Sequence, residues 1–64
     1  MTYKQVVDSM NGKTFYSERF GEEMVTVEGD VVVGESGLLH GLATKQDVRD
    51  LRNDYLKHYK QDRD

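Results

Sequence analysis

The sequence contains no cysteine, which excludes disulfide bonds and thiolate metal sites. Its two histidines, His40 and His58, are eighteen positions apart, and this spacing is not typical of a zinc site. We therefore expect no metal and no cofactor. A chain of 64 residues buries only about 60% of its extended surface. Without disulfides or a metal, the common remaining source of stability is oligomerisation, so we expect a homodimer, with an unusually well-packed monomer as the alternative.

The sequence also lacks a long apolar run. No stretch approaches the roughly 20 residues that span a bilayer, and the first residues are not typical of a secretory signal. We expect a cytoplasmic protein that does not contact membranes. Residues 1–44 carry three basic and seven acidic side chains, whereas residues 45–64 carry six basic and five acidic ones. Because so acidic a chain is not typical of proteins that coat nucleic acid, we do not expect nucleic acid to be the partner.

Motifs that carry chemistry are missing as well. The sequence has no phosphate-binding glycine loop, no His-Glu-x-x-His and no calcium-binding loop. Ser36 and His40 lie four positions apart in a glycine-rich connector, which indicates coincidence more than a nucleophile and its base. Glu22 and Glu23 would point to opposite faces of a strand and would not form an acid pair. We therefore predict no enzymatic activity and no catalytic residue.

The residues that are present predict a single α+β domain over 1–64, with the element order α-β-β-β-α. Thr2 and Gln5 have the spacing of a capping box for a short helix over residues 3–10, which ends at Asn11-Gly12. Residues 14–33 are rich in β-branched and aromatic side chains and predict antiparallel strands.

The first of these strands is expected over residues 14–20, with Tyr16, Glu18 and Phe20 on one face. The next two form a hairpin over residues 24–33 with a type II′ turn at Gly29-Asp30. In that register Val27 faces Val32, and both faces of the sheet carry apolar side chains. The second face then needs cover, either from the first helix or from a second chain. Residues 38–42 are predicted to be an apolar connector that packs under the last helix.

An amphipathic helix over residues 44–60 is the clearest feature of the sequence. Thr44 is its N-cap, and Asp47 stands three residues later, where it can complete the cap. Helical spacing places four apolar side chains in one stripe with Leu56 beside it: Val48, Leu51, Tyr55 and Tyr59.

Charges are sorted on the two sides of this stripe. One flank is basic, with Lys45, Arg49, Arg52, Lys60 and Arg63, and the other is acidic, with Asp47, Asp50 and Asp54. Asp54 can pair with His58 one turn later. In a parallel pair of these helices, Asp47 would face Arg52 of a second chain. The other interpretation is that the stripe covers the chain's own hairpin and that the charges are solvated. The predicted protein-interaction residues are Val48, Leu51, Arg52, Tyr55, Leu56, Tyr59, Asp47 and Asp54.

With its capped helix, its valine-rich hairpin at Gly29-Asp30 and its tail helix rich in lysine and aspartate, the chain resembles the short acidic proteins of phages and prophages of Gram-positive bacteria. The resemblance is one of general character and implies a small regulator or an inhibitor of a host factor. We predict a small non-enzymatic protein-binding or regulatory module that acts as a homo-oligomer, with an unidentified protein as a possible partner. The alternatives are a nucleic-acid-associated protein, an acidic DNA mimic that inhibits a DNA-handling protein, and a structural subunit whose only role is assembly.

Overall fold

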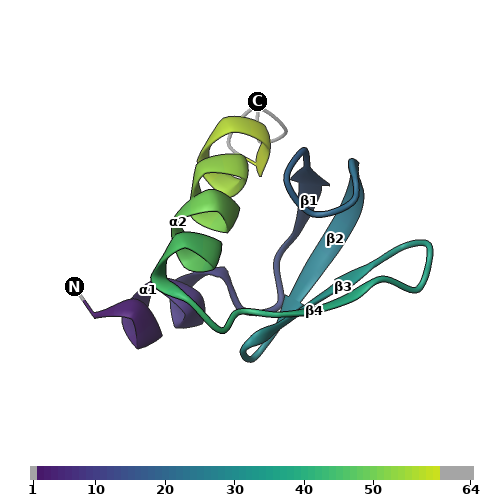
Figure 1. Cartoon of the computed structure of the whole chain (residues 1–64). Helices are drawn as coiled ribbons and strands as arrows, with labels where there is room; N and C mark the ends of the chain where they lie inside the picture. Colours follow the sequence, from purple (N-terminus) through teal and green to yellow (C-terminus); the bar gives the residue numbers. More distant parts are fainter. Residues whose placement is uncertain (1, 60–64) are drawn as a thin grey trace.

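The computed structural model describes residues 2–59 and confirms the predicted α+β class (Figure 1). Four strands form one antiparallel sheet in the order β1-β2-β3-β4. The elements in chain order are α1 (Tyr3–Met10), β1 (Thr14–Ser17), β2 (Glu23–Glu28), β3 (Val31–Gly34), β4 (Leu39–Gly41), α2 (Lys45–Asp54) and η1 (Tyr55–Tyr59). No helix within residues 2–59 has both the length and the apolar character that crossing a bilayer requires.

The hairpin of β2 and β3 has the predicted register, with Val27 opposite Val32 and Thr26 opposite Val33. Gly29 adopts a φ of 67°, which suits the first central position of a type II′ turn because glycine has no Cβ to clash there. Local sequence therefore fixes which residues of these strands share a face. Val27 and Val32 are fully buried.

The predicted capping box of α1 is also confirmed. Thr2 Oγ1 accepts a hydrogen bond from Gln5 N at 3.2 Å, and Gln5 Oε1 accepts one from Thr2 N at 2.9 Å. After α1, Asn11 Oδ1 accepts a bond of 2.8 Å from Gly29 N. The end of the helix is thereby tied to the hairpin turn, and Met10 is placed in the core.

The predicted order of three strands is wrong, because the sheet has four. β1 ends at Ser17 and not at residue 20, since residues 18–22 form a turn in which Gly21 and Glu22 have positive φ. Phe20 consequently leaves the face that carries Tyr16 and is buried in the core.

The segment predicted to be a connector under the last helix instead contains β4, which pairs with β3. Gly37, with a φ of 97°, lies in the turn that brings the chain back alongside β3. Leu38 and Leu42 pack against the core as expected, but Leu39 between them is 72% exposed. Alternation along a strand explains this difference, because neighbouring side chains point to opposite faces.

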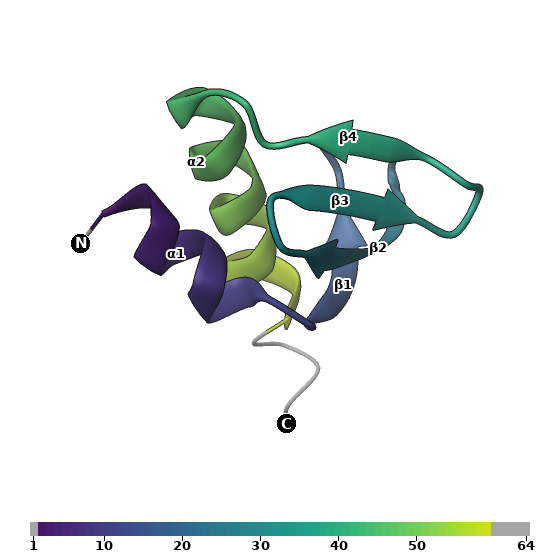
Figure 2. The ribbon, with the colours of Figure 1, turned by 90° about the horizontal axis from the view of Figure 1, so that it is seen from below.

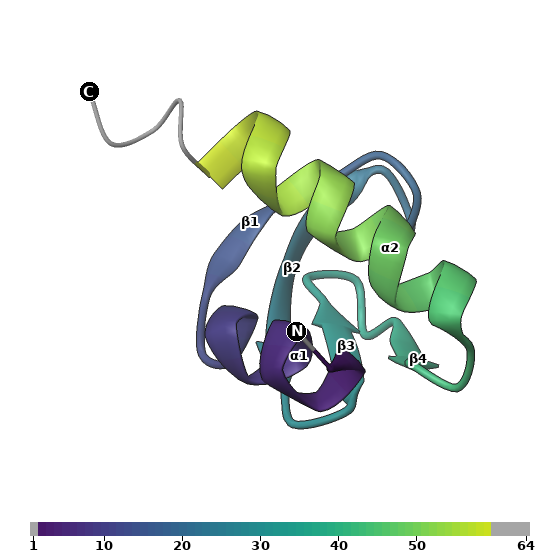
Figure 3. The ribbon, with the colours of Figure 1, turned by 90° about the vertical axis from the view of Figure 1, so that its left-hand side faces the viewer.

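Both helices lie on the same face of the sheet (Figures 2 and 3). Between the helices and the sheet lies one core cluster of fully or nearly buried side chains, made of Met10, Phe15, Phe20, Val25, Val27, Val32 and Leu51. One prediction was that the first helix would cover the second face of the sheet, and this is wrong, because α1 lies on the same face as α2. The second face carries no element of the chain within residues 2–59.

The last helix starts with the predicted capping box at Thr44 but is not α-helical throughout. Its α-helical part ends at Asp54, and η1 continues it as a π-helical turn to Tyr59. A π-helical turn takes up one more residue than an α-helical one. The spacing of apolar residues does not distinguish the two, so sequence periodicity predicted one continuous α-helix. The predicted end at residue 60 lies outside the described residues.

Replacing Leu51 by alanine tests whether α2 packs inside its own chain. Leu51 is fully buried in the core, so Leu51→Ala should lower the free energy of unfolding by about 2–5 kcal/mol. The matched control Leu56→Ala, at a position that is 43% exposed, should change it by only about 0.5 kcal/mol. Urea denaturation at several protein concentrations measures both. Equal effects, or a Leu51→Ala effect that grows on dilution, would place Leu51 between two copies and contradict this packing.

Candidate functional site

The apolar stripe of the last helix is used within the chain. Val48 and Leu51 are buried, and Tyr55 and Tyr59 are half-buried against the core. The ring of Tyr55 meets Phe15 of β1 edge-on, with 5.3 Å between centroids. Of the two interpretations that the sequence allowed, the structure therefore has the one in which the stripe covers its own sheet.

Asp47 is engaged at the start of α2. Its backbone N donates to Thr44 Oγ1 at 3.1 Å, and its Oδ2 accepts from Thr44 N at 3.3 Å. His40 of β4 places Nε2 3.7 Å from Asp47 Oδ1. Desolvation raises the pKa of Asp47, but the hydrogen bonds from Thr44 and the nearby His40 outweigh it and leave this pKa below its ordinary value. Asp47 therefore serves the cap and β4, and is not directed at a second chain.

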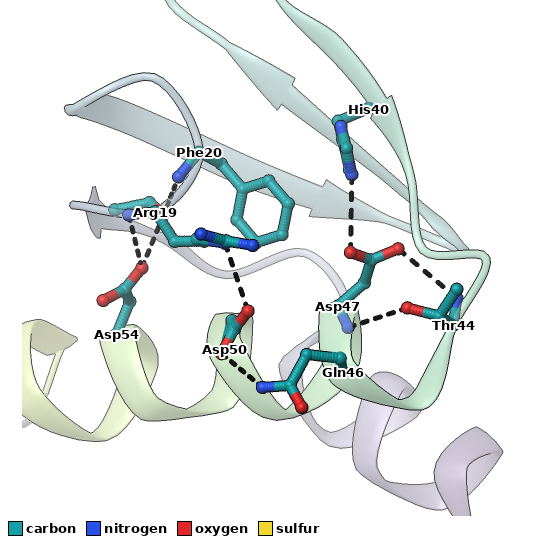
Figure 4. Close-up of polar contacts among 9 residues, drawn as sticks. Arg19, Phe20, His40, Thr44, Gln46, Asp47, Asp50 and Asp54 are labelled. Atoms are coloured by element: carbon teal, nitrogen blue, oxygen red, sulfur yellow. Dashed lines mark hydrogen bonds and ion pairs between the residues drawn. The ribbon is translucent and has the colours of Figure 1, made fainter.

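Asp54 is the most buried charged residue among those described, since only 4% of its surface is exposed. Its Oδ2 accepts a hydrogen bond of 2.7 Å from Ser17 Oγ. The same oxygen accepts one of 3.1 Å from Arg19 N (Figure 4). Ser17 Oγ in turn accepts from Phe20 N at 2.9 Å. These bonds close the loop between β1 and β2 onto the end of α2. We refer to this group (Ser17, Arg19 N, Phe20 N and Asp54) as the Asp54 clamp.

A second charged contact supports the clamp. Arg19 Nε lies 3.1 Å from Asp50 Oδ2, and Asp50 Oδ1 accepts a bond of 2.9 Å from Gln46 Nε2 (Figure 4). Asp50 and Asp54 thus both face the loop between β1 and β2, while Asp47 faces β4. The acidic flank that the sequence predicted is real, but its partners belong to the same chain.

Glu18 joins the same loop to η1. Its Oε2 lies 2.8 Å from Lys57 Nζ and 2.8 Å from His58 Nε2. Hydrogen bonds from Lys57 and His58 hold the pKa of the Glu18 carboxyl below its usual range, and Glu18 in turn raises the pKa of Lys57. The prediction that His58 pairs with Asp54 is wrong, because His58 Nε2 is hydrogen-bonded to Glu18 Oε2.

The basic flank of α2 points away from the sheet. Arg49, Arg52, Asn53 and Leu56 are exposed and line a shallow hollow. Lys45 places its Nζ 5.5 Å from the ring centroid of Tyr3, a cation–π contact with α1. Lys60 and Arg63, which the sequence analysis assigned to this flank, lie outside the described residues.

The face of the sheet opposite the helices is the second apolar face that the sequence predicted to need cover. Cross-strand partners place Thr14, Thr26, Val33 and Leu39 in one row across all four strands. Thr14 Oγ1 and Thr26 Oγ1 share a hydrogen bond of 2.8 Å, which orders the β1 end of the row. Next to the row lie Tyr16, Met24 and Val31. We call these seven residues the open face.

Acidic residues border the open face. Glu28 and Glu35 line a shallow hollow together with Met24 and Val33. Of the other carboxylates in the sheet region, Glu18 contacts Lys57 and His58 of η1, and Glu23 contacts Ser36 in the turn after β3. Five of the seven open-face residues are apolar and two are threonines, and the carboxylates of Glu28 and Glu35 lie beside them.

The groups considered for catalysis do not come together. Ser36 Oγ donates to Glu23 Oε2 at 2.8 Å, whereas His40 lies against Asp47 and the ring of Phe20. Glu23 also accepts from Ser36 N at 3.3 Å, so it supports the turn after β3. Glu22, its neighbour in sequence, lies in the loop before β2 with a φ of 53°. Ser36 and Glu23 have structural roles here.

Sequence reasoning predicted Asp54 as an interaction residue but missed its partners in the clamp, and it predicted the second apolar face of the hairpin but not the part of the open face on β1 and β4. Ser17 and Arg19 lie 37 and 35 positions from Asp54, and no local pattern links them. For the open face, the alternation of Met24, Thr26 and Val31 with buried valines was visible, but Leu39 required knowledge of β4.

Replacing Asp54 tests the clamp. Asp54→Ala leaves the Ser17 hydroxyl and the Arg19 N–H without their acceptor in a buried setting, and should lower the free energy of unfolding by about 2–4 kcal/mol. The matched control is Asp50→Ala on the same flank. Its partner Arg19 is 63% exposed, so this change should cost less than about 1 kcal/mol. Chemical denaturation measures both, and equal losses would show that Asp54 has no special role.

Comparison of the chain with protein-family models, curated proteins and solved structures finds no significant match. The function proposed below therefore rests on the geometry and charge of the chain itself.

Proposed function

We propose that this protein is a small protein-binding module whose open face docks a segment of a partner protein. The partner segment would present apolar side chains bordered by lysine or arginine. The observation that carries the proposal is the open face, whose row of Thr14, Thr26, Val33 and Leu39 no helix within residues 2–59 covers. An exposed surface with apolar side chains and a polar border is typical of a protein interaction site.

Exposure on the open face supports this choice of surface. Leu39 is 72% exposed, and Tyr16, whose ring also meets His58 of η1, is 37% exposed. Both are large side chains whose burial in a partner would be favourable. The apolar stripe of α2, by contrast, is already buried in the core. The open face therefore offers apolar area that binding can remove from water without unfolding the chain.

Charge indicates what kind of partner fits. The border carries Glu28 and Glu35, and basic side chains do not line the hollow between them. Complementary potentials across an interface favour association and suppress wrong partners. A basic and apolar segment is therefore the expected occupant.

A second copy fits this surface less well. The predicted homodimer paired the helices through Val48, Leu51, Tyr55 and Tyr59 with Asp47 facing Arg52, but these apolar residues pack on the chain's own core. The open face remains for a homodimer, yet two copies placed face to face would bring two acidic borders together. Like charges at an interface are unfavourable, so we favour a different protein as the partner.

Acidic mimicry of DNA is the second candidate, because the same carboxylates favour it. Such mimicry would use the charges at Glu18, Glu22, Glu23, Glu28, Asp30 and Glu35 and would bind a basic DNA-handling protein. It differs from the first proposal in one respect: the apolar side chains of the open face would contribute little to the affinity for the partner. Removing apolar side chains therefore distinguishes the two.

Selection from a random peptide library tests the proposal without a known partner. Immobilised wild-type protein should enrich peptides in which apolar residues are flanked by lysine or arginine. Synthetic copies of these peptides should bind the double variant Val33→Thr/Leu39→Ser at least about tenfold more weakly, because burial of these side chains supplies much of the affinity. The matched control Arg49→Ser/Leu56→Ser, on the outward side of α2, should bind as the wild type does.

Three results would contradict the proposal. Peptides that bind the open-face variant and the wild type equally, but lose affinity in Glu28→Gln/Glu35→Gln, would favour acidic mimicry. Loss of binding only in the helix variant would place the site on α2. A wild-type dimer that dissociates in Val33→Thr/Leu39→Ser, measured by sedimentation, would make a second copy the occupant of the open face.

A further inference from the structure

Three possible metal ligands meet at the end of the last helix, away from the open face. They are Glu18 in the loop between β1 and β2, Asp54 at the end of α2 and His58 in η1. One ligand atom from each lies within 4.8 Å of the others. Glu18 and Asp54 are separated in sequence, and the fold alone brings them together. Such convergence of two carboxylates and an imidazole gives a mixed oxygen and nitrogen donor set.

The charge at Asp54 is a second and independent observation. Asp54 is 96% buried, yet the donors that bond to it within residues 2–59 are neutral: the Ser17 hydroxyl and the Arg19 backbone N–H. The guanidinium of Arg19 contacts Asp50, and the ammonium of Lys57 contacts Glu18. Buried charges in proteins are generally paired with an opposite charge or coordinate a metal. The Asp54 carboxylate is hydrogen-bonded but bonds to no cationic donor within residues 2–59, and Lys57, whose pKa Asp54 helps to raise, acts on it without a direct bond. A cation bound beside Asp54 would therefore be favoured.

We propose that Glu18, Asp54 and His58 bind a divalent transition-metal cation of the Zn²⁺ class, which joins the loop between β1 and β2 to the end of α2. Zn²⁺ accepts both imidazole nitrogen and carboxylate oxygen. Asp54 and His58 are four positions apart on one helical run, as ligands on a shared helix face commonly are. A fourth coordination position remains for water.

The supporting contacts fit a metal ligand set. Ser17 Oγ and Arg19 N hold the Asp54 carboxylate in a fixed orientation, and hydrogen bonds of this kind orient carboxylate ligands in metal sites. His58 is half-buried, and its ring meets Tyr16 edge-on with 5.1 Å between centroids. Two of the three ligands are therefore pre-positioned by packing.

Two changes accompany binding. With metal–ligand bonds of about 2.0–2.2 Å, neighbouring ligand atoms in a tetrahedral site are about 3.3 Å apart. Glu18 Oε2 and His58 Nε2 lie 2.8 Å apart, so this contact must open slightly. The ammonium of Lys57, now 2.8 Å from Glu18 Oε2, must also move away. Lys57 is 56% exposed along its side chain and is free to turn into solvent.

Calorimetric titration of the full chain with Zn²⁺, after removal of any affinity tag and of bound metal by a chelator, tests the proposal. Co²⁺ absorption in the visible range reports the geometry of the site. Wild type should bind one ion per chain, and His58→Ala should bind at least about tenfold more weakly. His40→Ala removes the other histidine of the chain and is the matched control, so it should bind as the wild type does.

Two further variants sharpen the test. Lys57→Gln removes the competing ammonium and should bind Zn²⁺ about tenfold more tightly than the wild type. Asp54→Asn keeps an oxygen that accepts from Ser17 and Arg19 but loses the charge, so it should remain folded in the absence of metal and bind Zn²⁺ at least about tenfold more weakly. The proposal is overturned if neither wild type nor Lys57→Gln binds Zn²⁺, or if His40→Ala weakens binding as much as His58→Ala does.

Discussion

The buried carboxylate of Asp54 is the interaction on which the arrangement of this chain depends. Taking a charged group out of water is costly unless hydrogen bonds compensate it. Ser17 and the Arg19 backbone N–H provide those bonds from the loop between β1 and β2. Because Ser17 is the last residue of β1 and also accepts from Phe20 N, the same group fixes the strand end, the turn and the burial of Phe20. One side chain on α2 thus orders a loop that would otherwise be a surface turn.

The clamp also determines which surfaces remain free. α2 turns its apolar stripe to the core, its acidic flank to the loop and to β4, and its basic flank to solvent. With α1 packed on the same side of the sheet, no helix within residues 2–59 covers the other face (Figure 3). The open face, with five apolar residues and two threonines, is left there beside the carboxylates of Glu28 and Glu35. The binding proposal therefore concerns the face of the sheet that the helices leave uncovered, and the metal proposal concerns the end of the last helix, where it contacts the loop between β1 and β2.

Sequence patterns predicted the parts of the fold that depend on neighbouring residues. Both capping boxes and the turn at Gly29-Asp30 were predicted correctly, because a cap or a two-residue turn is complete within a few positions. The fourth strand was missed, since β4 has only three residues and its identity depends on pairing with β3. A short apolar segment without clear alternation is ambiguous from sequence alone.

The candidate sites were harder to predict for the same reason. The sorting of charge on the last helix was recognised, but the partners of Asp54 lie 35 and 37 positions away in the sequence. An acidic residue on a helix flank is usually solvated, and nothing near Asp54 in the sequence indicates burial. Glu18 and His58 likewise meet only through the fold. Four residues of the open face, Met24, Thr26, Val31 and Val33, follow from the predicted hairpin register, whereas Thr14, Tyr16 and Leu39 join them only once the pairing of β1 and β4 is known.

Amide hydrogen exchange measured by NMR tests the central claim, that Asp54 closes the loop, most directly. Protection from exchange reports the free energy of opening each hydrogen bond. The N–H groups of Arg19 and Phe20 lie in a surface loop, and we predict that they exchange as slowly as that of Val27 in β2. Glu22 in the same loop serves as the rapidly exchanging reference. Exchange of Arg19 and Phe20 at the rate of Glu22 would contradict the account.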